Sequence, residues 1–115
     1  MAYSTRIVDS VAILELDGEV DLYHSPRVRE EIGKLISKKN PTILINFQKV
    51  SYIDSSGLAT IIDAFQKMRA YKGRLALAAL SKPVLSVFEV ARLNQYFQIF
   101  ENEGAALGAL TTPKA

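Results

Sequence analysis

A short, continuous apolar run is the feature that most constrains what this chain can fold into. Residues 42–46 read Thr-Ile-Leu-Ile-Asn. Because successive side chains of a strand point to opposite faces, a run that is apolar at consecutive positions is typical of a strand covered on both sides, as in parallel sheets. Arg74 to Leu80 has the same character. The chain is therefore predicted to build a sheet that helices cover.

Amphipathic helices separate these strands. Ser25-Pro26 predicts a helix start, with serine as the cap and proline at the first helical position. A second helix reads from about Ser56 to Tyr71 and closes at Lys72-Gly73, with glycine as a left-handed cap. Ser81 is expected to cap a third helix. The positions predicted to face the core are Val28, Ile32, Leu35 and Ile36; Leu58, Ile61, Ile62, Phe65 and Met68; and Val84, Val87, Phe88 and Ala91.

The two ends of the chain add a hairpin and a closing helix. Thr5 to Val8 is expected to pair with Val11 to Leu16 across an Asp9-Ser10 turn, and Asp17-Gly18 is a further turn signal. Gln95 to Phe100 reads as a final strand, and Gly104 to Leu110 as a short helix. Strands followed by alternating helices and strands predict an α/β fold: a mixed, mostly parallel sheet with an N-terminal β-hairpin and about four helices.

Length and composition restrict the class of protein. The 115 residues predict one domain over residues 1–115, with a core of about 4–110 and a frayed tail from Thr111. A net charge of +2, with no basic run longer than Lys38-Lys39, argues against direct nucleic-acid binding. Without cysteine there is no disulfide or thiol chemistry. No secretory signal or run of about 18 apolar residues occurs, so a cytoplasmic protein off the membrane is expected.

The strand-to-helix junction at residues 54–58 is the most informative candidate site. It reads Asp54-Ser55-Ser56-Gly57-Leu58 and follows the apolar stretch Val50–Ile53. Serine and aspartate cap helix N-termini, where backbone N–H groups lack partners, and a phosphate is favoured at the same place by the helix dipole. Two hydroxyls stand where one suffices, and Gly57 would let a partner approach the backbone closely. The junction is either a plain cap or a phosphorylation switch.

Two kinds of enzymatic or phosphotransfer site find little support. A serine hydrolase elbow needs glycine two residues before the nucleophile, where this chain has Ile53 or Asp54, and the only histidine is His24, in a loop. Asp54 as the phosphoacceptor of a receiver domain would need an early acidic cluster to hold Mg²⁺, and Asp9 stands alone there.

Neither a metal nor a cofactor is predicted. Asp17, Glu19 and Asp21 alternate along a possible strand, but they have no second ligand group and read as a solvated or partner-facing edge. A phosphate-cradling loop is missing too, because no Gly-Lys-Ser/Thr triplet occurs.

The stretch from Val50 to Leu58 resembles the signature of the STAS domain, specifically that of bacterial anti-sigma factor antagonists. Leu16 to Asp21 is similar to the Gly-Glu-Leu-Asp turn of that family, and Ser81 to Val84, with Phe88 and Leu93, is similar to its third helix. The resemblance covers nearly the whole chain. It implies a STAS-type fold and a regulator that catalyses nothing itself.

The resemblance also implies a partner-switching cycle in transcription regulation. In that family the serine directly after the aspartate is the phosphoacceptor, which is Ser55 here, and Ser56 is then the expected cap. The unphosphorylated protein binds an anti-sigma factor, a serine kinase with a histidine-kinase-like ATPase fold, and thereby frees a sigma factor. Phosphorylation of Ser55 ends the binding, and a metal-dependent serine phosphatase restores it.

The surface expected to contact the partner combines two loops. Tyr23 is its natural aromatic anchor, or else a loop aromatic that covers a helix end. The residues of this surface are Asp21, Leu22, Tyr23, His24, Ser25, Asp54, Ser55, Ser56, Gly57 and Leu58.

The sequence is also compatible with other functions. The same fold could serve as a stressosome-type scaffold or as a STAS subunit of a lipid-transport complex, and Ser55 would then carry no phosphate. A small enzyme that uses Ser55 or Asp54 is a further class.

Overall fold

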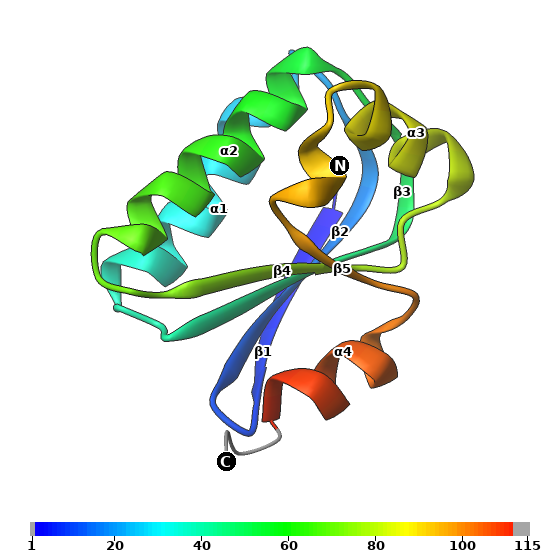
Figure 1. Cartoon of the computed structure of the whole chain (residues 1–115). Coiled ribbons are helices and arrows are strands. Elements are labelled where there is room, and N and C mark those ends of the chain that lie inside the picture. The colour runs from blue at the N-terminus through cyan, green and yellow to red at the C-terminus, as the bar shows by residue number, and fades with distance from the viewer. Residues whose placement is uncertain (1, 112–115) are drawn as a thin grey trace.

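A five-stranded sheet in the order β1-β2-β3-β4-β5 forms the centre of the fold (Figure 1). The computed structural model describes residues 2–111. Only the first pair, β1 with β2, is antiparallel; the other three pairs are parallel. The predicted α/β class, with an N-terminal hairpin and a mostly parallel sheet, is confirmed. In chain order the elements are β1 (Ala2–Val8), β2 (Val11–Val20), α1 (Ser25–Ser37), β3 (Thr42–Ile53), α2 (Ser55–Arg69), β4 (Arg74–Ala78), α3 (Lys82–Val90), the 3-10 turn η1 (Leu93–Gln95), β5 (Gln98–Phe100) and α4 (Glu103–Thr111).

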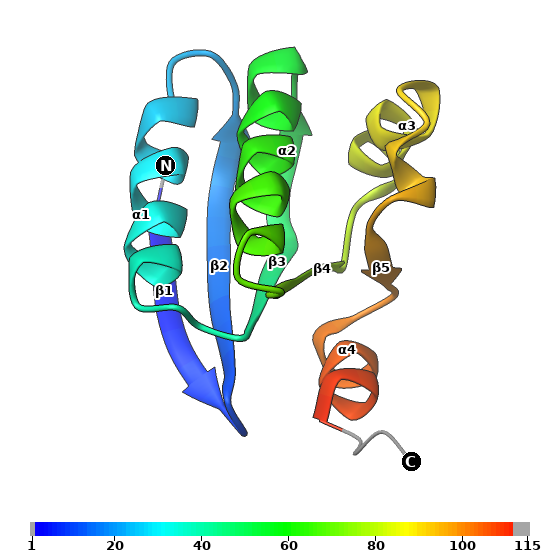
Figure 2. The same cartoon turned by 60° about the vertical axis from the view of Figure 1, so that its left-hand side comes forward.

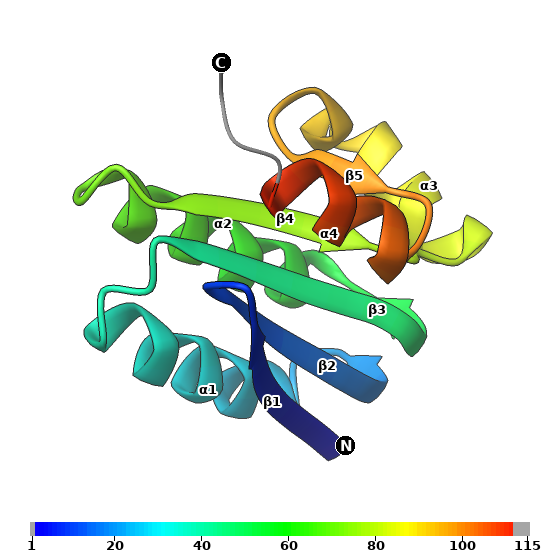
Figure 3. The same cartoon turned by 90° about the horizontal axis from the view of Figure 1, so that it is seen from below.

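The helices divide between the two faces of the sheet. Crossovers between parallel strands are right-handed, and each one here steps to the next strand in the same direction, so α1, α2 and α3 come to lie on one face. Helix α4 follows β5 and packs on the opposite face (Figures 2 and 3). Among residues 2–111, no helix is long and apolar enough to cross a membrane.

The apolar run at 42–46 is covered on both sides, as its pattern predicts. Ile43 and Ile45 belong to the large core under α1–α3, whereas Leu44 belongs to a smaller core under α4, and all three are fully buried. The polar end of the run is buried too: the Asn46 side-chain amide donates to the Glu103 carboxylate at the start of α4. Arg6 of β1 pairs with the same carboxylate, so α4 is tied to the sheet by two polar contacts.

Strands β2 and β3 are longer than the sequence indicated. Asp17-Gly18 was predicted to be a turn, but β2 continues through both residues to Val20. Register shifts occur after Glu15 and again after Gly18, whose φ of 120° is a conformation that glycine adopts readily. Asp17-Gly18 therefore forms part of a bulge within β2 instead of a turn. Strands β2 and β3 consequently end side by side, at Val20 and Ile53.

Several details of the helices also differ from the predictions. Lys72, with a φ of 61°, takes the left-handed position after α2 in place of Gly73. A Cβ on Gly73 would lie 2.8 Å from the Tyr71 ring, so glycine is needed there for space. On α3 the predicted core residue Ala91 is exposed, because it follows the last residue of the helix. Thr111 closes α4, and the rest of the predicted tail lies outside the described residues.

The hairpin turn carries backbone strain that glycine would relieve. Asp9 and Ser10 both have positive φ, 48° and 68°, as a two-residue type I′ turn requires. We expect Ser10→Gly to raise the free energy of unfolding by about 0.5–1 kcal/mol, because a side chain in the left-handed region costs more than the extra freedom of glycine. Urea unfolding measures this. The control Ser86→Gly, inside α3, should lower it by about 0.5 kcal/mol; a loss of stability in both variants would contradict the prediction.

Candidate functional site

The parallel ends of β2 and β3 bring two loops together. Val20 pairs with Ile53, and the Asp54 amide donates to the Val20 carbonyl at 3.3 Å. The loop after β2, residues 21–24, therefore lies against the junction at 54–58. Both contribute to an open pocket lined by Asp21, Leu22, Tyr23, Tyr52 and Asp54.

Asp54 is the residue that holds this junction. Its Oδ1 accepts hydrogen bonds from the amides of Ser56 (3.0 Å) and Gly57 (3.2 Å), and from the Ser56 hydroxyl (2.5 Å). Its Oδ2 accepts from the Leu22 amide at 3.1 Å. The backbone of Asp54 is extended, as expected of an N-cap. Asp54, and not Ser56, caps α2, and the same carboxylate fastens the neighbouring loop.

These donors lower the pKa of Asp54. The Ser56 hydroxyl contributes most, the amides of Gly57, Leu22 and Ser56 add to it, and partial burial opposes them. Hydrogen bonds to the ionised form of a carboxyl group favour that form. Asp54 is therefore a carboxylate at neutral pH, with one charge fixed beside Ser55.

The loop at 21–25 has its own hydrogen bonds. Asp21 Oδ1 accepts from the His24 amide at 2.9 Å and contacts His24 Nδ1 at 2.8 Å. The hydrogen bond from the His24 amide is the main cause of a lowered pKa for Asp21. Ser25 is the first residue of α1 and is buried, and its hydroxyl donates to the Asp21 carbonyl at 2.6 Å. The predicted capping role of Ser25 is therefore wrong: its side chain closes the loop behind it.

The Ser25 and Ser56 hydroxyls meet between the two loops, with their oxygens 3.1 Å apart. Each hydroxyl carries one proton. Ser25 gives its proton to the Asp21 carbonyl, and Ser56 gives its proton to the Asp54 carboxylate. Two protons therefore cannot satisfy all three contacts at once, and both hydroxyls are engaged within the chain.

Ser55 is in a different position from its neighbour. It is the first residue of α2 and is exposed, and within residues 2–111 no hydrogen bond to its hydroxyl is found. The two adjacent serines, identical in the sequence, therefore differ chemically. Ser56 is part of the structure of the junction, whereas the Ser55 hydroxyl is available for reaction.

The reason for a glycine at position 57 differs from the one predicted. Gly57 is buried, and a Cβ there would lie 2.5 Å from the Val20 carbonyl oxygen and 2.6 Å from Ile53 Cγ1. The missing side chain lets α2 approach the end of β2, and it opens no space for a partner. Leu58 is also largely buried.

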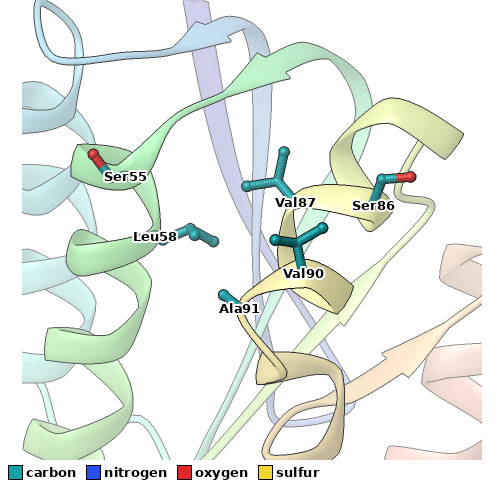
Figure 4. Close-up of a pocket in the computed structure, with 6 residues that line it drawn as sticks. All are labelled: Ser55, Leu58, Ser86, Val87, Val90 and Ala91. Atoms are coloured by element: carbon teal, nitrogen blue, oxygen red, sulfur yellow. The ribbon is translucent and has the colours of Figure 1, made fainter.

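A groove beside Ser55 was missed by the sequence reasoning. It lies between the first turns of α2 and the second half of α3, with Ser55 at its rim and Leu58 pointing toward α3 (Figure 4). Val90, on α3, is 85% exposed. The available signal was Val90 itself, an apolar residue outside the predicted inner face of its helix. The groove is lined by Ser55, Leu58, Ser86, Val87, Val90 and Ala91.

Exposed apolar side chains also lie in the loop after β2. Leu22 is 76% exposed and Tyr23 is 85% exposed, and the rings of Tyr23 and His24 form a T-shaped contact with their centres 5.0 Å apart. Exposed apolar side chains that gather in one region commonly mark a protein–protein contact. The exposed hydroxyl of Ser55 is thus bordered by an apolar groove and by an apolar loop.

Comparison with known proteins identifies the family. The model of the STAS domain matches residues 2–106. The anti-sigma-B factor antagonist of Listeria monocytogenes is 33% identical over 91 residues, which are 79% of this chain and 80% of that protein. The chain belongs to the STAS domain family, and its relatives include proteins named anti-sigma factor antagonists.

Solved structures share the fold. An anti-sigma factor antagonist from Mycobacterium paratuberculosis superimposes with a TM-score of 0.89 at 20% identity, covering 96% of this chain and 94% of that one. The anti-sigma factor antagonist SpoIIAA in its unphosphorylated form gives 0.74 at 22% identity, covering 97% and 100%. The phosphorylated form of SpoIIAA, from Bacillus, gives 0.74 at 24% identity, covering 95% and 99%.

The close approach at Gly57 predicts a large effect of one methyl group. We expect Gly57→Ala to lower the free energy of unfolding by about 1–3 kcal/mol, because the new Cβ must displace backbone at the end of β2. Thermal or urea unfolding measures the change. A Cβ added to Gly33, within α1, would have nothing within 4 Å, so Gly33→Ala should instead stabilise by about 0.5–1 kcal/mol. Equal effects of the two substitutions would refute this account of Gly57.

The lowered pKa of Asp54 predicts how its contribution to stability depends on pH. Folding lowers this pKa below its ordinary value of 3.8, so the ionised carboxylate stabilises the fold above pH 3.8, and this contribution is lost as the pH falls through the folded-state pKa. Asp54→Asn keeps a capping side chain without the charge. Urea unfolding from about pH 7 to about pH 2 should show wild type more stable than Asp54→Asn at neutral pH, with the difference shrinking at acidic pH as the carboxylate takes up its proton. A difference independent of pH would contradict the prediction.

Proposed function

We propose that this protein is an anti-sigma factor antagonist controlled by phosphorylation of Ser55. The proposal rests on the names of its relatives, among them the Listeria antagonist, and on the existence of a phosphorylated form of SpoIIAA. The observation in this chain that carries it is the contrast between the exposed, unbonded hydroxyl of Ser55 and the occupied hydroxyl of Ser56. A kinase needs a hydroxyl that can leave its present contacts, and within residues 2–111 Ser55 has none to break.

A phosphate on Ser55 would stay at the surface. The amides of Ser56 and Gly57, which would otherwise attract an anion to the helix N-terminus, already donate to Asp54. Phosphorylation adds about −1.5 to −2 charges, and the Asp54 carboxylate repels them. The phosphate is thus turned toward solvent, where a partner, a kinase and a phosphatase can all reach it.

We infer that the switch works by exclusion at the interface and not by refolding. A partner packed on this surface would have to bury the phosphate against the apolar groove and beside Asp54, and a buried, unpaired charge costs about 3–5 kcal/mol.

The unphosphorylated protein would bind an anti-sigma factor and so release a sigma factor. The partner that fits the cycle is a serine kinase with a histidine-kinase-like ATPase fold, and a metal-dependent serine phosphatase would reverse the modification. The protein itself would be a cytoplasmic, single-domain regulator and not an enzyme. In support, no base contacts the Ser55 hydroxyl within residues 2–111, and His24 is engaged with Asp21.

The contact surface would combine charge and apolar area. Tyr23 and Leu22 would provide the exposed apolar anchors on one side, and the groove at Val90 would provide them on the other. Asp21 and Asp54 would supply negative charge between them. Within the predicted set, Ser25, Ser56 and Gly57 would act by holding the two loops in place, because their side-chain positions are filled from within the chain.

The switch predicts which substitution releases the partner. Wild type, Ser55→Glu and Ser55→Ala would serve as parallel baits for a pull-down from native lysate, with partners identified by mass spectrometry. We expect a kinase-like ATPase on wild type and on Ser55→Ala, and its loss from Ser55→Glu, which should weaken binding by about 100-fold or more because a charge is buried. Equal recovery of the same partners on all three baits would mean that the domain is a constitutive scaffold.

A further inference from the structure

Strand β1 leaves one long edge of the sheet without a partner. It pairs only with β2, and in the part of the chain that the structure describes no element lies outside it (Figure 3). The opposite edge is formed by β5, which has three residues, whereas β1 has seven. The main-chain N–H and C=O groups along the outer side of β1 therefore have no strand partner over the full seven-residue length of the strand.

This edge has few of the devices that usually prevent pairing with another chain. Natural edge strands carry lysine, proline or a bulge, or are very short. Strand β1 reads Ala-Tyr-Ser-Thr-Arg-Ile-Val, and its register with β2 is unbroken from Ala2 to Val8. Its one charge, on Arg6, is paired with Glu103. Ile7 is 68% exposed, although it lies on the face of the sheet that bears α1.

We propose that β1 pairs antiparallel with β1 of a second copy, centred on Thr5. In this register every residue of the strand has a partner, and the pairs on the face that bears α1 are chemically matched. Tyr3 lies opposite Ile7 of the other copy, Thr5 opposite Thr5, Ser4 opposite Arg6 and Ala2 opposite Val8. Aromatic–β-branched and Thr–Thr pairs across strands are stabilising, by about 0.2–1 kcal/mol each.

The sequence of β1 selects this register over its neighbours. A two-fold axis through the sheet keeps the helices of both copies on one face. This requires each even-numbered residue to lie opposite an even-numbered residue of the other copy, and each odd-numbered residue opposite an odd-numbered one. The next such register toward the C-terminus would place Arg6 opposite Arg6, and like charges directly opposite are destabilising. The next one toward the N-terminus would centre on Ser4, and Ile7 would then have no partner among residues 2–8. Only the register centred on Thr5 pairs all seven residues.

Side chains on β1 are already held for this contact. The Tyr3 hydroxyl accepts a hydrogen bond from Arg27, whose guanidinium lies 5.0 Å from the centre of the Tyr3 ring. Fixing a side chain before association reduces the entropy lost on binding. The result would be one continuous sheet that runs through both copies. Ser55 follows β3, two strands away from this edge, so the pairing is separate from the proposed switch.

Cysteine cross-linking tests both the edge and the register, because the chain has no cysteine of its own. The test uses three single variants, each at an exposed position: Thr5→Cys, Ser4→Cys and Arg6→Cys. Under mild oxidation with copper phenanthroline, Thr5→Cys should give a disulfide-linked dimer, since the two positions face each other within disulfide reach. Ser4→Cys and Arg6→Cys should cross-link poorly alone and efficiently when mixed. Equal yields from all combinations, or none from Thr5→Cys, would overturn the proposal.

Molar mass in solution gives an independent measurement on a chain without cysteine. Light scattering after size exclusion should show wild type approaching twice the mass of one chain as its concentration rises. Ile7→Lys should raise the concentration needed for dimerisation by about 2- to 30-fold, through loss of both Tyr3–Ile7 pairs. Val90→Lys, at a similarly exposed valine on α3, should leave it unchanged. A monomeric wild type at millimolar concentration, or equal behaviour of the two variants, would refute the proposal.

Discussion

The carboxylate of Asp54 is the interaction on which the candidate site depends. It accepts three hydrogen bonds from the start of α2 and one from the loop after β2, so a single side chain caps the helix and joins the two loops. Four donors on one carboxylate explain its lowered pKa. Because these donors are taken, the start of α2 has less capacity to hold another anion. The cap and the exposed hydroxyl of Ser55 are thus two consequences of one arrangement.

The arrangement requires the sheet to place the loop after β2 and the junction after β3 side by side. Strands β2 and β3 run in parallel and end together at Val20 and Ile53, and Gly57 lets α2 pack against that end. The Ser25 and Ser56 hydroxyls then meet across the gap, with two protons for three contacts. A change in either loop must therefore alter the hydrogen bonds of the other. The buried core and the exposed loops are connected through these few polar atoms.

Whether the sequence could predict a feature of this fold and site depends on how far apart in the chain the interacting residues lie. The apolar run at 42–46 and the Asp9-Ser10 turn are local patterns, and the strands they predict are present. The bulge at Gly18 was misread as a turn because its outcome depends on pairing with β3.

The difference between Ser55 and Ser56 could not be predicted from the residues alone, since it is created by Ser25 and by the direction of the Asp54 side chain. The groove at Val90 likewise exists only once α3 packs beside α2. The assignment of the phosphoacceptor to Ser55 came from the family resemblance and stays a prediction, which the contacts of the two serines favour.

The most direct test of this account is the position of the phosphate on protein taken from its native host. Tandem mass spectrometry of the peptide that contains Ser55 and Ser56 distinguishes the two sites. The account predicts a single phosphate on Ser55 and none on Ser56, because Ser56 would have to give up its bond to the Asp54 carboxylate to react. Phosphate on Ser56, or a peptide that carries none under conditions in which the kinase is active, would contradict it.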